Sequence, residues 1–316
     1  MDDLHILPKV RDSLSYLYIE HKKVDRDSKA IALHDKEGKT TVPCSSLNLL
    51  MLGPGTSITH AAVLTLAENG CLISWVGEAS VRFYAQGLGE TRSSHRLLHQ
   101  ARMVSYPELR MQVVRRMYEM RFPEPLEPNL SLRQIRGKEG IRVREAYFKY
   151  SQLYGVKWKG RSFSTHDWNK SDPINRALSA ANSCLYGICH AAIVAAGFSP
   201  ALGFIHTGKM LSFVYDIADL YKVDVTVPIA FQTAAEGTQD VETRVRHACR
   251  DKFYQTKLLQ RIIPDIEKAL GLDTNPVTAQ EAEFNQNPAA ASNLWDPEGE
   301  VKGGTNFAED FEEEKC

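Results

Sequence analysis

The stretch "ALSAANSCLYGICHAAIVAAG", residues 177–197, is the longest apolar run in this 316-residue chain. Its length and composition approach those of a membrane span, but it contains Asn182, Ser183 and His190 and is rich in alanine. These polar and small residues favour a buried core helix of a globular protein. The rest of the chain is therefore expected to pack around this segment.

The flanking sequence supplies the ends of this helix and predicts further helices. In the preceding "KSDP", Ser171 or Asp172 is the expected cap and Pro173 lies in the first turn, while Gly197 ends the helix. From residue 95 onward, apolar residues at three- and four-residue spacing predict other helices. These segments are "HRLLHQARMVS", "YPELRMQVVRRMYEMRF", "IRVREAYFKYSQLYG" and "VETRVRHACRDKFYQTKLLQRIIPDIEKALG", with Pro264 a kink or boundary in the last.

The first 88 residues have the pattern of strands instead. Short stretches rich in β-branched or aromatic residues predict them: "SLSYLYIE", "KAIALHD", "KTTVP", "NLLML", "CLISWV" and "VRFYAQG". The stretch "HDKEGKT" predicts a hairpin turn at residues 36–38. One helix, capped by Thr56 or Ser57 and closed by Gly70, is expected to interrupt the strands.

These patterns together predict an α+β fold with two domains and a tail. A small β-rich domain occupies residues 1–88, and a larger all-helical domain occupies residues 95–272. From residue 273 to 316 the composition shifts to Asn, Gln, Pro, Ala and Glu, which predicts an acidic, disordered tail.

The formal net charge of −1 conceals a strong asymmetry. Residues 273–316 carry 11 acidic and 2 basic residues, a net of −9, which leaves +8 for residues 1–272. Within that body, residues 95–170 hold 16 Lys or Arg against 7 Asp or Glu. Such concentrated positive charge indicates a polyanion partner, most often nucleic acid, although uneven surface charge is an alternative.

Other patterns narrow the classes of function. The six cysteines form no C-x-x-C pair, and the N-terminus has no apolar signal-peptide core, so a reducing cytoplasm is expected. The glycine-containing stretches "GPG" and "GLG" complete neither a phosphate-loop nor a dinucleotide-binding fingerprint. The sequence therefore gives no sign of a nucleotide-dependent enzyme.

The segment "GFIHTGKMLSFVYDIADLYK", residues 203–222, places polar groups in an apolar surrounding. On a helix over residues 211–222, Asp216 and Asp219 lie three residues apart and are neighbours on one face. That face is either a short solvated stripe or the wall of an internal cleft. His206 stands just ahead of the helix. A histidine and two carboxylates that converge on one place would suit a divalent metal ion.

A further acid, Glu139, lies in the basic stretch "LRQIRGKEGIRVREAY", residues 132–147. The surrounding basic residues are Arg133, Arg136, Lys138, Arg142 and Arg144. A site that processes phosphate needs this mixture, since carboxylates hold the cation and basic groups hold the backbone. Alternatively, Glu139 balances local positive charge near the start of a helix.

Four motifs, "WVGEASVRFYAQG", "RGKEGIRVREAY", "SAANSCLYG" and "GFIHTGKMLSFVYDIADLYK", resemble those of one protein family. In this order they are similar to the CRISPR-associated integrases of spacer acquisition, the first proteins of the Cas series, in their type I-E branch. The resemblance covers about residues 4–272 and leaves out the acidic tail. It implies a β-rich N-terminal domain, a helical catalytic domain and a cytoplasmic homodimer that does not engage a membrane. Two such dimers would be bridged by a small companion protein.

The resemblance also implies the site. Glu139, His206 and Asp219 match the family's ligands for Mg²⁺ or Mn²⁺, and Asp216 matches an additional catalytic acid near that metal. Contacts with DNA are implied for basic and aromatic residues: Arg82, Arg136, Lys138, Arg142, Tyr186, Lys209 and Lys222. The alternative for Tyr186 is that it only packs in the core helix. The alternative for Lys209 and Lys222 is that they are ordinary solvated lysines without a role in DNA binding.

The implied activity is transesterification, in which a 3′-OH end of a foreign double-stranded DNA fragment is joined into the CRISPR repeat. With water in place of the 3′-OH, the same site would be a metal-dependent nuclease of branched DNA. A third hypothesis is a DNA-binding scaffold without enzymatic activity.

Overall fold

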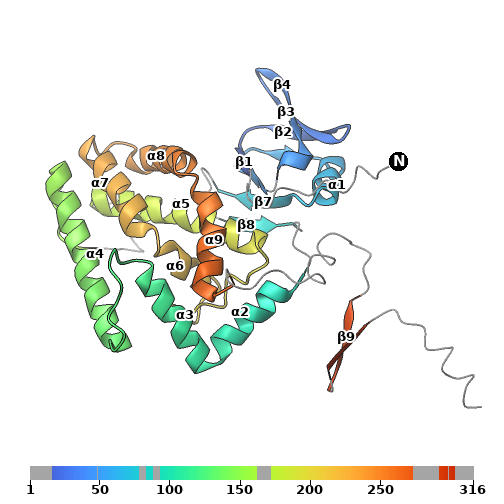
Figure 1. Cartoon of the computed structure of the whole chain (residues 1–316). Helices are drawn as coiled ribbons and strands as arrows, with labels where there is room; N and C mark the ends of the chain where they lie inside the picture. The colour runs from blue at the N-terminus through green and yellow to red at the C-terminus, as the bar shows by residue number, and fades with distance from the viewer. Residues whose placement is uncertain are drawn as a thin grey trace, which may run out of the picture. The chain divides into compact units, whose positions relative to one another are not determined.

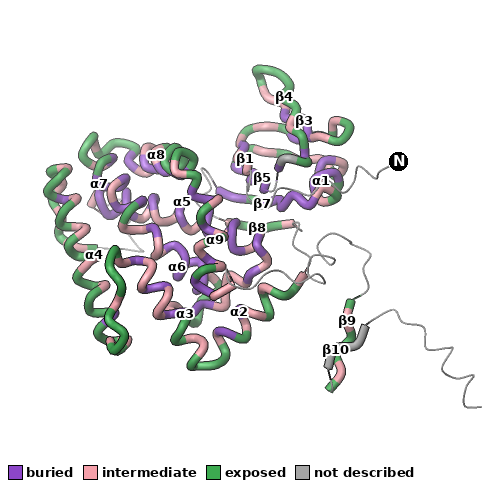
Figure 2. The backbone as a smooth tube through the Cα atoms, in the orientation of Figure 1, coloured by how far each residue is buried: buried purple, intermediate pink, exposed green. Residues whose placement is uncertain are grey.

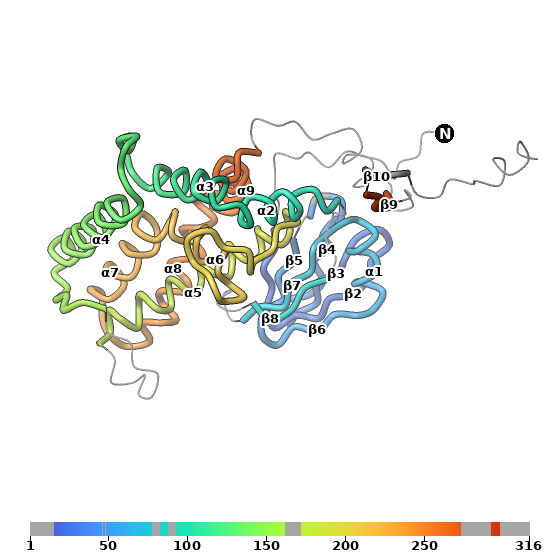
Figure 3. The backbone as a smooth tube through the Cα atoms, turned by 90° about the horizontal axis from the view of Figure 1, so that it is seen from below, coloured from blue at the N-terminus to red at the C-terminus, as the bar shows by residue number. Residues whose placement is uncertain are grey.

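The computed structural model describes residues 16–47, 49–77, 83–87, 93–161, 172–272, 292–297 and 299–302. The chain forms two compact units, Met1–Pro276 and Val277–Cys316, and each is described by itself. Within the first unit the strands come before residue 87 and the helices mostly after residue 94, and Figures 1 and 3 show them gathered on opposite sides. The predicted α+β class is confirmed.

Four strands form the sheet that packs against the helices. Its order is β1 (Tyr16–Ile19), β5 (Leu49–Leu52), β7 (Leu72–Val76) and β8 (Phe83–Gln86). The first three strands are parallel, and β8 is antiparallel to β7. All four residues of β5 are buried, as expected for a central parallel strand. Side chains of β5 and β7 belong to the same hydrophobic core as the helices, so the division into two domains near residue 88 stays a prediction.

The second sheet has the order β4 (Gly38–Pro43), β3 (Ala30–Asp35), β2 (Lys23–Asp27) and β6 (Ser57–Ile58). Strands β3 and β4 form the predicted hairpin, and the Asp35 carboxylate accepts hydrogen bonds from the amides of Glu37 and Gly38 in the turn. Strand β2 was not expected, because its polar sequence lacks the apolar pattern of a strand. Strand β6 was not expected, because Ser57 and Ile58 were assigned to the start of the following helix. Together with helix α1 (His60–Glu68), this sheet encloses a separate small core.

The helices that follow residue 94 make up the helical part of the first unit, and the long helix α5 lies in its interior. They are α2 (His95–Ser105), α3 (Pro107–Glu119), α4 (Leu132–Tyr154), α5 (Pro173–Ala195), α6 (Ser212–Ala218), the π-helical turn η4 (Lys222–Thr226), α7 (Val227–Ala235), α8 (Val241–Gln255) and α9 (Leu258–Leu270). Helix α5 contacts α6, α7, α8 and α9. It is long and apolar enough to cross a membrane, yet 72% of its most apolar 18-residue stretch is buried inside the protein (Figure 2). The expected core helix is confirmed.

Several predicted helix ends need correction. The α1 cap is Thr59, not Thr56 or Ser57. The α5 cap is Asp172, one of the two predicted caps, and Pro173 follows it in the first turn as expected. Pro264 does not end or divide a helix, because it lies inside α9. The boundary between α8 and α9 falls instead at Thr256 and Lys257, where Lys257 takes a left-handed conformation with φ 49°.

The second unit contains an antiparallel pair of strands, β9 (Asn293–Asp296) and β10 (Gly299–Lys302). The sequence predicted a disordered tail here, so this hairpin is a difference from the expectation. Pro297, a turn-favouring residue, lies in the turn that follows β9.

Candidate active site

A pocket of about 300 Å³ brings together elements that are distant in sequence. Glu139 lines it from α4, His206 from the loop before α6, and Asp219 from the residue that ends α6. The other lining residues are Tyr118, Arg121, Val143, Tyr147, Ile205, Lys222, Val223 and Val227. The three predicted metal ligands therefore face one pocket.

His206 is held in place by the buried carboxylate of Asp216. His206 Nδ1 lies 2.7 Å from Asp216 Oδ1, and the backbone amides of Phe204, Ile205 and His206 also donate to this carboxylate at 2.6, 3.1 and 2.8 Å. The loop is tight enough to require glycine at residue 203, where a Cβ would meet the His206 carbonyl oxygen at 2.4 Å. The bond to Nδ1 leaves Nε2 of the ring available to a ligand.

Asp216 lies next to the candidate metal site, as the resemblance implied, but behind His206 and outside the pocket lining. Its side chain has no exposed surface, and it is absent from the pocket lining. This burial is incompatible with a solvated stripe on the helix, since Asp216 points into the protein. Asp216 therefore orients the His206 ring through Nδ1, on the side away from the pocket, as a carboxylate partner of a metal-binding histidine does.

Asp219 lies directly beside His206 and the half-buried Lys222. Asp219 Oδ2 is 4.0 Å from His206 Nε2, and Asp219 Oδ1 accepts a hydrogen bond from Lys222 Nζ at 2.6 Å. Burial alone would lower the pKa of Lys222, but Asp219 and the Tyr186 hydroxyl outweigh it, so this pKa is raised. Lys222 thus remains a cation at the pocket wall.

Glu139 lies on α4 after its first turn, and it both lines the pocket and balances the charge of its neighbour Arg142. Arg142 Nε and Nη2 bind its two carboxylate oxygens at 2.8 and 3.0 Å. This bidentate bond is the largest cause of a raised pKa for Arg142. Glu139 Oε1 also lies 3.4 Å from Arg121 Nη1.

Arg121 is the pocket residue that sequence reasoning missed. It follows α3, and its side chain is only 3% exposed. Its Nη1 lies between two predicted ligands, 3.4 Å from Glu139 Oε1 and 3.7 Å from Asp219 Oδ2. The only sequence signal was its position in a basic region, which Arg121 shares with many solvent-exposed arginines.

The pocket residues fit a divalent cation by donor type. Two carboxylates and one imidazole are ligands that suit Mg²⁺ and especially Mn²⁺. Across the described ranges, however, no three His, Cys, Asp or Glu side chains already stand at metal-holding distances. Glu139 and Asp219 bind the pocket's own cations instead, so these side chains would have to shift to take up an ion.

The predicted DNA-binding residues have varied positions. Arg136, Lys138 and Lys209 are exposed, and Lys138 Nζ lies 3.5 Å from Glu127. The Tyr186 ring lies 4.9 Å from Lys222 Nζ and 5.0 Å from the Tyr215 ring, which places it next to the pocket as well as on the core helix. Arg82 lies outside the described residues.

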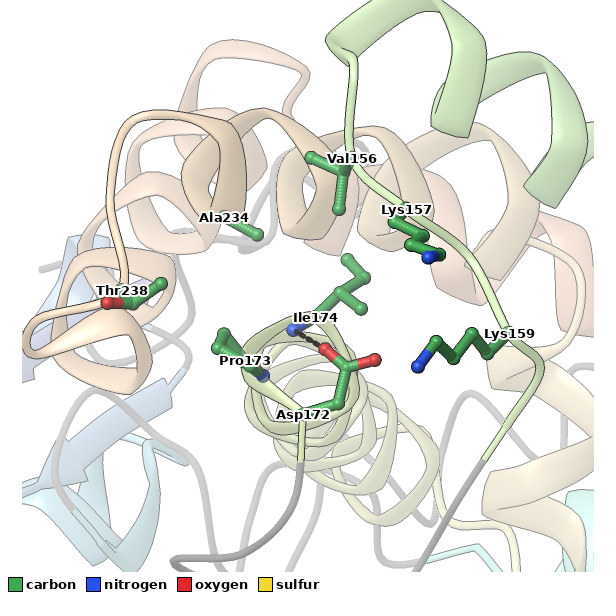
Figure 4. A pocket seen from close by; sticks show the side chains of 8 residues that line it. All are labelled: Val156, Lys157, Lys159, Asp172, Pro173, Ile174, Ala234 and Thr238. Carbon is green, nitrogen blue, oxygen red and sulfur yellow. Dashed lines mark hydrogen bonds between the residues drawn. The ribbon is translucent and has the colours of Figure 1, made fainter.

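A second pocket of similar size lies at the start of α5 (Figure 4). Lys157 and Lys159 line it, and Asp172 is the only acid among its eight lining residues. The Asp172 carboxylate caps α5 by accepting the Ile174 amide at 3.0 Å, as the dashed line shows. Among the described residues that line this pocket, the one acid thus serves as a helix cap.

Comparison with known proteins places the chain in a protein family. The family model for CRISPR associated protein Cas1 matches residues 120–250, which include Glu139, His206 and Asp219. The "CRISPR-associated endonuclease Cas1 2" of Thermus thermophilus is 54% identical over 98% of this chain and 94% of its own length. The "CRISPR-associated endonuclease Cas1" of Escherichia coli is 47% identical over 83% of this chain and 86% of its own.

A solved structure agrees with these relatives. The crystal structure of a TtCas1–DNA complex superposes with a TM-score of 0.75 at 57% identity, over 84% of this chain and 99% of that one. The relatedness thus extends over both the strands and the helices. The chain belongs to the Cas1 family of CRISPR-associated proteins.

Proposed function

We propose that this protein is a divalent-metal-dependent DNA endonuclease and integrase of CRISPR adaptation. The observation that carries the proposal is the convergence of Glu139, His206 and Asp219 on one pocket that the basic residues Arg121 and Lys222 also line. Relatives named as endonucleases and a relative crystallised with DNA support the same class of substrate and reaction.

In this proposal, Glu139, His206 Nε2 and Asp219 hold Mg²⁺ or Mn²⁺. When bound, the ion supplies polarisation of a phosphodiester and stabilisation of the charge that builds up on it. Asp216 keeps the His206 ring oriented through Nδ1. The basic side chains Lys222 and Arg142 stand close enough to neutralise phosphate charge at the pocket.

The proposed reaction exchanges one phosphodiester for another. The 3′-oxygen of the incoming fragment bonds to phosphorus in the CRISPR repeat, and the bond from that phosphorus to the 3′-oxygen of the repeat strand breaks. The attacking hydroxyl loses a proton and the leaving oxygen gains one. No nucleoside triphosphate is consumed, which agrees with the absence of a phosphate-loop motif from the sequence.

The surrounding surface has roles in this proposal as well. Exposed Arg136, Lys138 and Lys209 contact the DNA backbone without reading bases, and Tyr186 lies where a DNA end would approach. The full activity is proposed to need a cytoplasmic homodimer and a small companion protein, and the type I-E branch remains our assignment for the chain.

The deciding experiment is joining of a short duplex with 3′-OH ends into a supercoiled plasmid that carries a CRISPR repeat. Wild type and His206→Ala are compared in Mn²⁺ with the companion protein, and a 3′-blocked duplex serves as the matched substrate control. Joining by wild type alone, with 3′-OH ends alone, is the expected result. Equal joining by His206→Ala would contradict the metal site.

The same experiment separates the competing functions. Plasmid cleavage that does not depend on a 3′-OH would indicate a nuclease of branched DNA. Binding of DNA without any metal-dependent reaction, once a working companion and substrate are verified with a related integrase, would indicate a scaffold.

A further inference from the structure

The pocket contains a buried cation with unused hydrogen-bond donors. Arg121 Nε and Nη2 are buried and have no hydrogen-bond partner among the described residues. The guanidinium lies 4.9 Å from the centre of the Tyr118 ring, and the residue lines the pocket. A guanidinium stays charged at any physiological pH, and burial of its unpaired N–H groups costs free energy. These donors are left for an acceptor that the described residues do not supply.

The charges around the pocket are already balanced without a metal ion. Three acidic groups, Glu139, Asp216 and Asp219, stand against three basic groups, Arg121, Arg142 and Lys222. Glu139 is shared by Arg142 and Arg121, and Asp219 is shared by Lys222 and Arg121. Within the described part of the chain, Arg121 is the one cation that pairs with both carboxylates. A divalent ion that enters this pocket alone therefore meets carboxylates that are already paired with the resident cations.

We infer that Arg121 couples the binding of the divalent cation to the binding of DNA. In the DNA-free protein, Arg121 occupies the carboxylates of Glu139 and Asp219 and weakens their affinity for the ion. A DNA phosphate offers oxygens to the unpaired Nε and Nη2 and draws the guanidinium off the carboxylates, which then become free to bind the ion. The pocket thus loads its ion together with its substrate.

The physical basis of this coupling is differential contact. DNA and the cation each favour the arrangement in which Arg121 pairs with phosphate, so each increases the affinity of the other by the same factor. The planar guanidinium is well suited to this exchange, because it binds carboxylate and phosphate oxygens with the same fork of donors. The inference rests on the proposed metal site at Glu139, His206 and Asp219.

A purely structural Arg121 would behave differently. If it only neutralised Glu139 and Asp219, its removal would destabilise the fold without changing how much the cation affects DNA binding. The measurable difference between the two roles is therefore the ratio of the DNA dissociation constants without and with the ion.

The test measures this ratio by fluorescence anisotropy with the full chain and a labelled, 3′-blocked duplex at constant ionic strength. For wild type, saturating Mn²⁺ is expected to tighten DNA binding about tenfold or more, within the usual range of such couplings. For Arg121→Gln the factor is expected to fall below about threefold. Gel analysis checks that the duplex stays intact during the measurement.

Two control variants frame the result. Arg250→Gln removes the same charge from an exposed arginine of α8 and is expected to keep the wild-type ratio, whatever its effect on DNA affinity. Arg121→Lys retains the charge without the planar fork, and it is expected to give an intermediate ratio. Thermal melting of each variant verifies folding before its ratio is compared with wild type.

Direct Mn²⁺ titration, followed by the electron paramagnetic resonance of the free ion, separates this inference from the proposed function. DNA-free Arg121→Gln is expected to bind Mn²⁺ several-fold more tightly than wild type, and His206→Ala is expected to lose the site. An unchanged DNA affinity of wild type on adding Mn²⁺, or full coupling in a folded Arg121→Gln, would overturn the inference. Equal Mn²⁺ binding by His206→Ala and wild type would overturn the metal site itself.

Discussion

The interior of the first unit has two contrasting regions, the packing around α5 and the pocket beside α6. Around α5 the buried side chains are almost all apolar, including Leu178, Leu185 and Phe213. At the pocket, charged groups are buried in pairs, and Arg121 has donors without partners. Buried ion pairs contribute little net stability compared with apolar packing. The difference indicates that α5 supplies the stability that a costly, chemically active pocket requires.

The largest expected effect comes from a substitution in the apolar packing around α5. Leu178→Ala, on α5, removes a fully buried side chain and should lower the free energy of unfolding by about 2–5 kcal/mol. Urea unfolding followed by circular dichroism measures the change. Leu153→Ala, at a 64% exposed position of α4, is the matched control and should be near neutral. Equal losses in both variants would contradict the assigned core.

The second prediction concerns the pocket beside α6 and removes one of its candidate metal ligands. Glu139→Ala should lower the rate of strand joining by on the order of 10²–10³-fold, because the pocket loses a group that holds charge at the reaction centre. Duplex binding measured without the divalent ion should be largely retained, because the ion-dependent tightening needs the intact site. Glu145→Ala, an exposed acid on the same helix, should join at the wild-type rate in the plasmid assay. Full joining by Glu139→Ala would remove this residue from the site.

A third prediction concerns a buried histidine of α5 that is outside the pocket. Burial lowers the pKa of His190 to about 4, and its ring lies 3.8 Å from the Phe83 ring. Between pH 6.5 and 4 the unfolded chain takes up a proton that the folded protein resists, so stability should fall as the pH falls. The loss should reach about 3 kcal/mol at pH 4.

The variant His190→Asn should remove this part of the pH dependence. Urea unfolding at several pH values between 4 and 7 measures the slope for each protein. The exposed His60→Asn on α1 should keep the wild-type slope. A slope unaffected by His190→Asn would mean that this ring is protonated equally in both states.

The smallest effect is expected for a substitution of Asp216, the buried residue that orients His206. Asp216→Asn weakens the hold on His206 Nδ1 and should reduce Mn²⁺ affinity about 10–100-fold, as loss of a partner of a metal-binding histidine typically does. Titration of Mn²⁺ into the folded variant measures it. Asp224→Asn, an exposed neighbour beyond α6, should bind Mn²⁺ as wild type does.

Local signals in the sequence were sufficient for many elements. The α5 cap, the β3–β4 hairpin turn and the limits of α2 follow from short-range chemistry, because caps and turns depend on a few adjacent residues. Strand β2 and the α8–α9 boundary were not predicted. The first is a polar strand stabilised by its neighbours, and the second depends on a left-handed Lys257.

The sequence by itself determined the α+β class, the core helix and the identities of the candidate ligands Glu139, His206 and Asp219. These depend on composition, periodicity and motif resemblance, which are local properties of the chain. Only the tertiary structure decided that Asp216 is a buried support for His206 and that Arg121 lies between Glu139 and Asp219. Those positions depend on packing between α3, α4 and α6, and no pattern within one segment specifies which charged side chains from distant segments will meet.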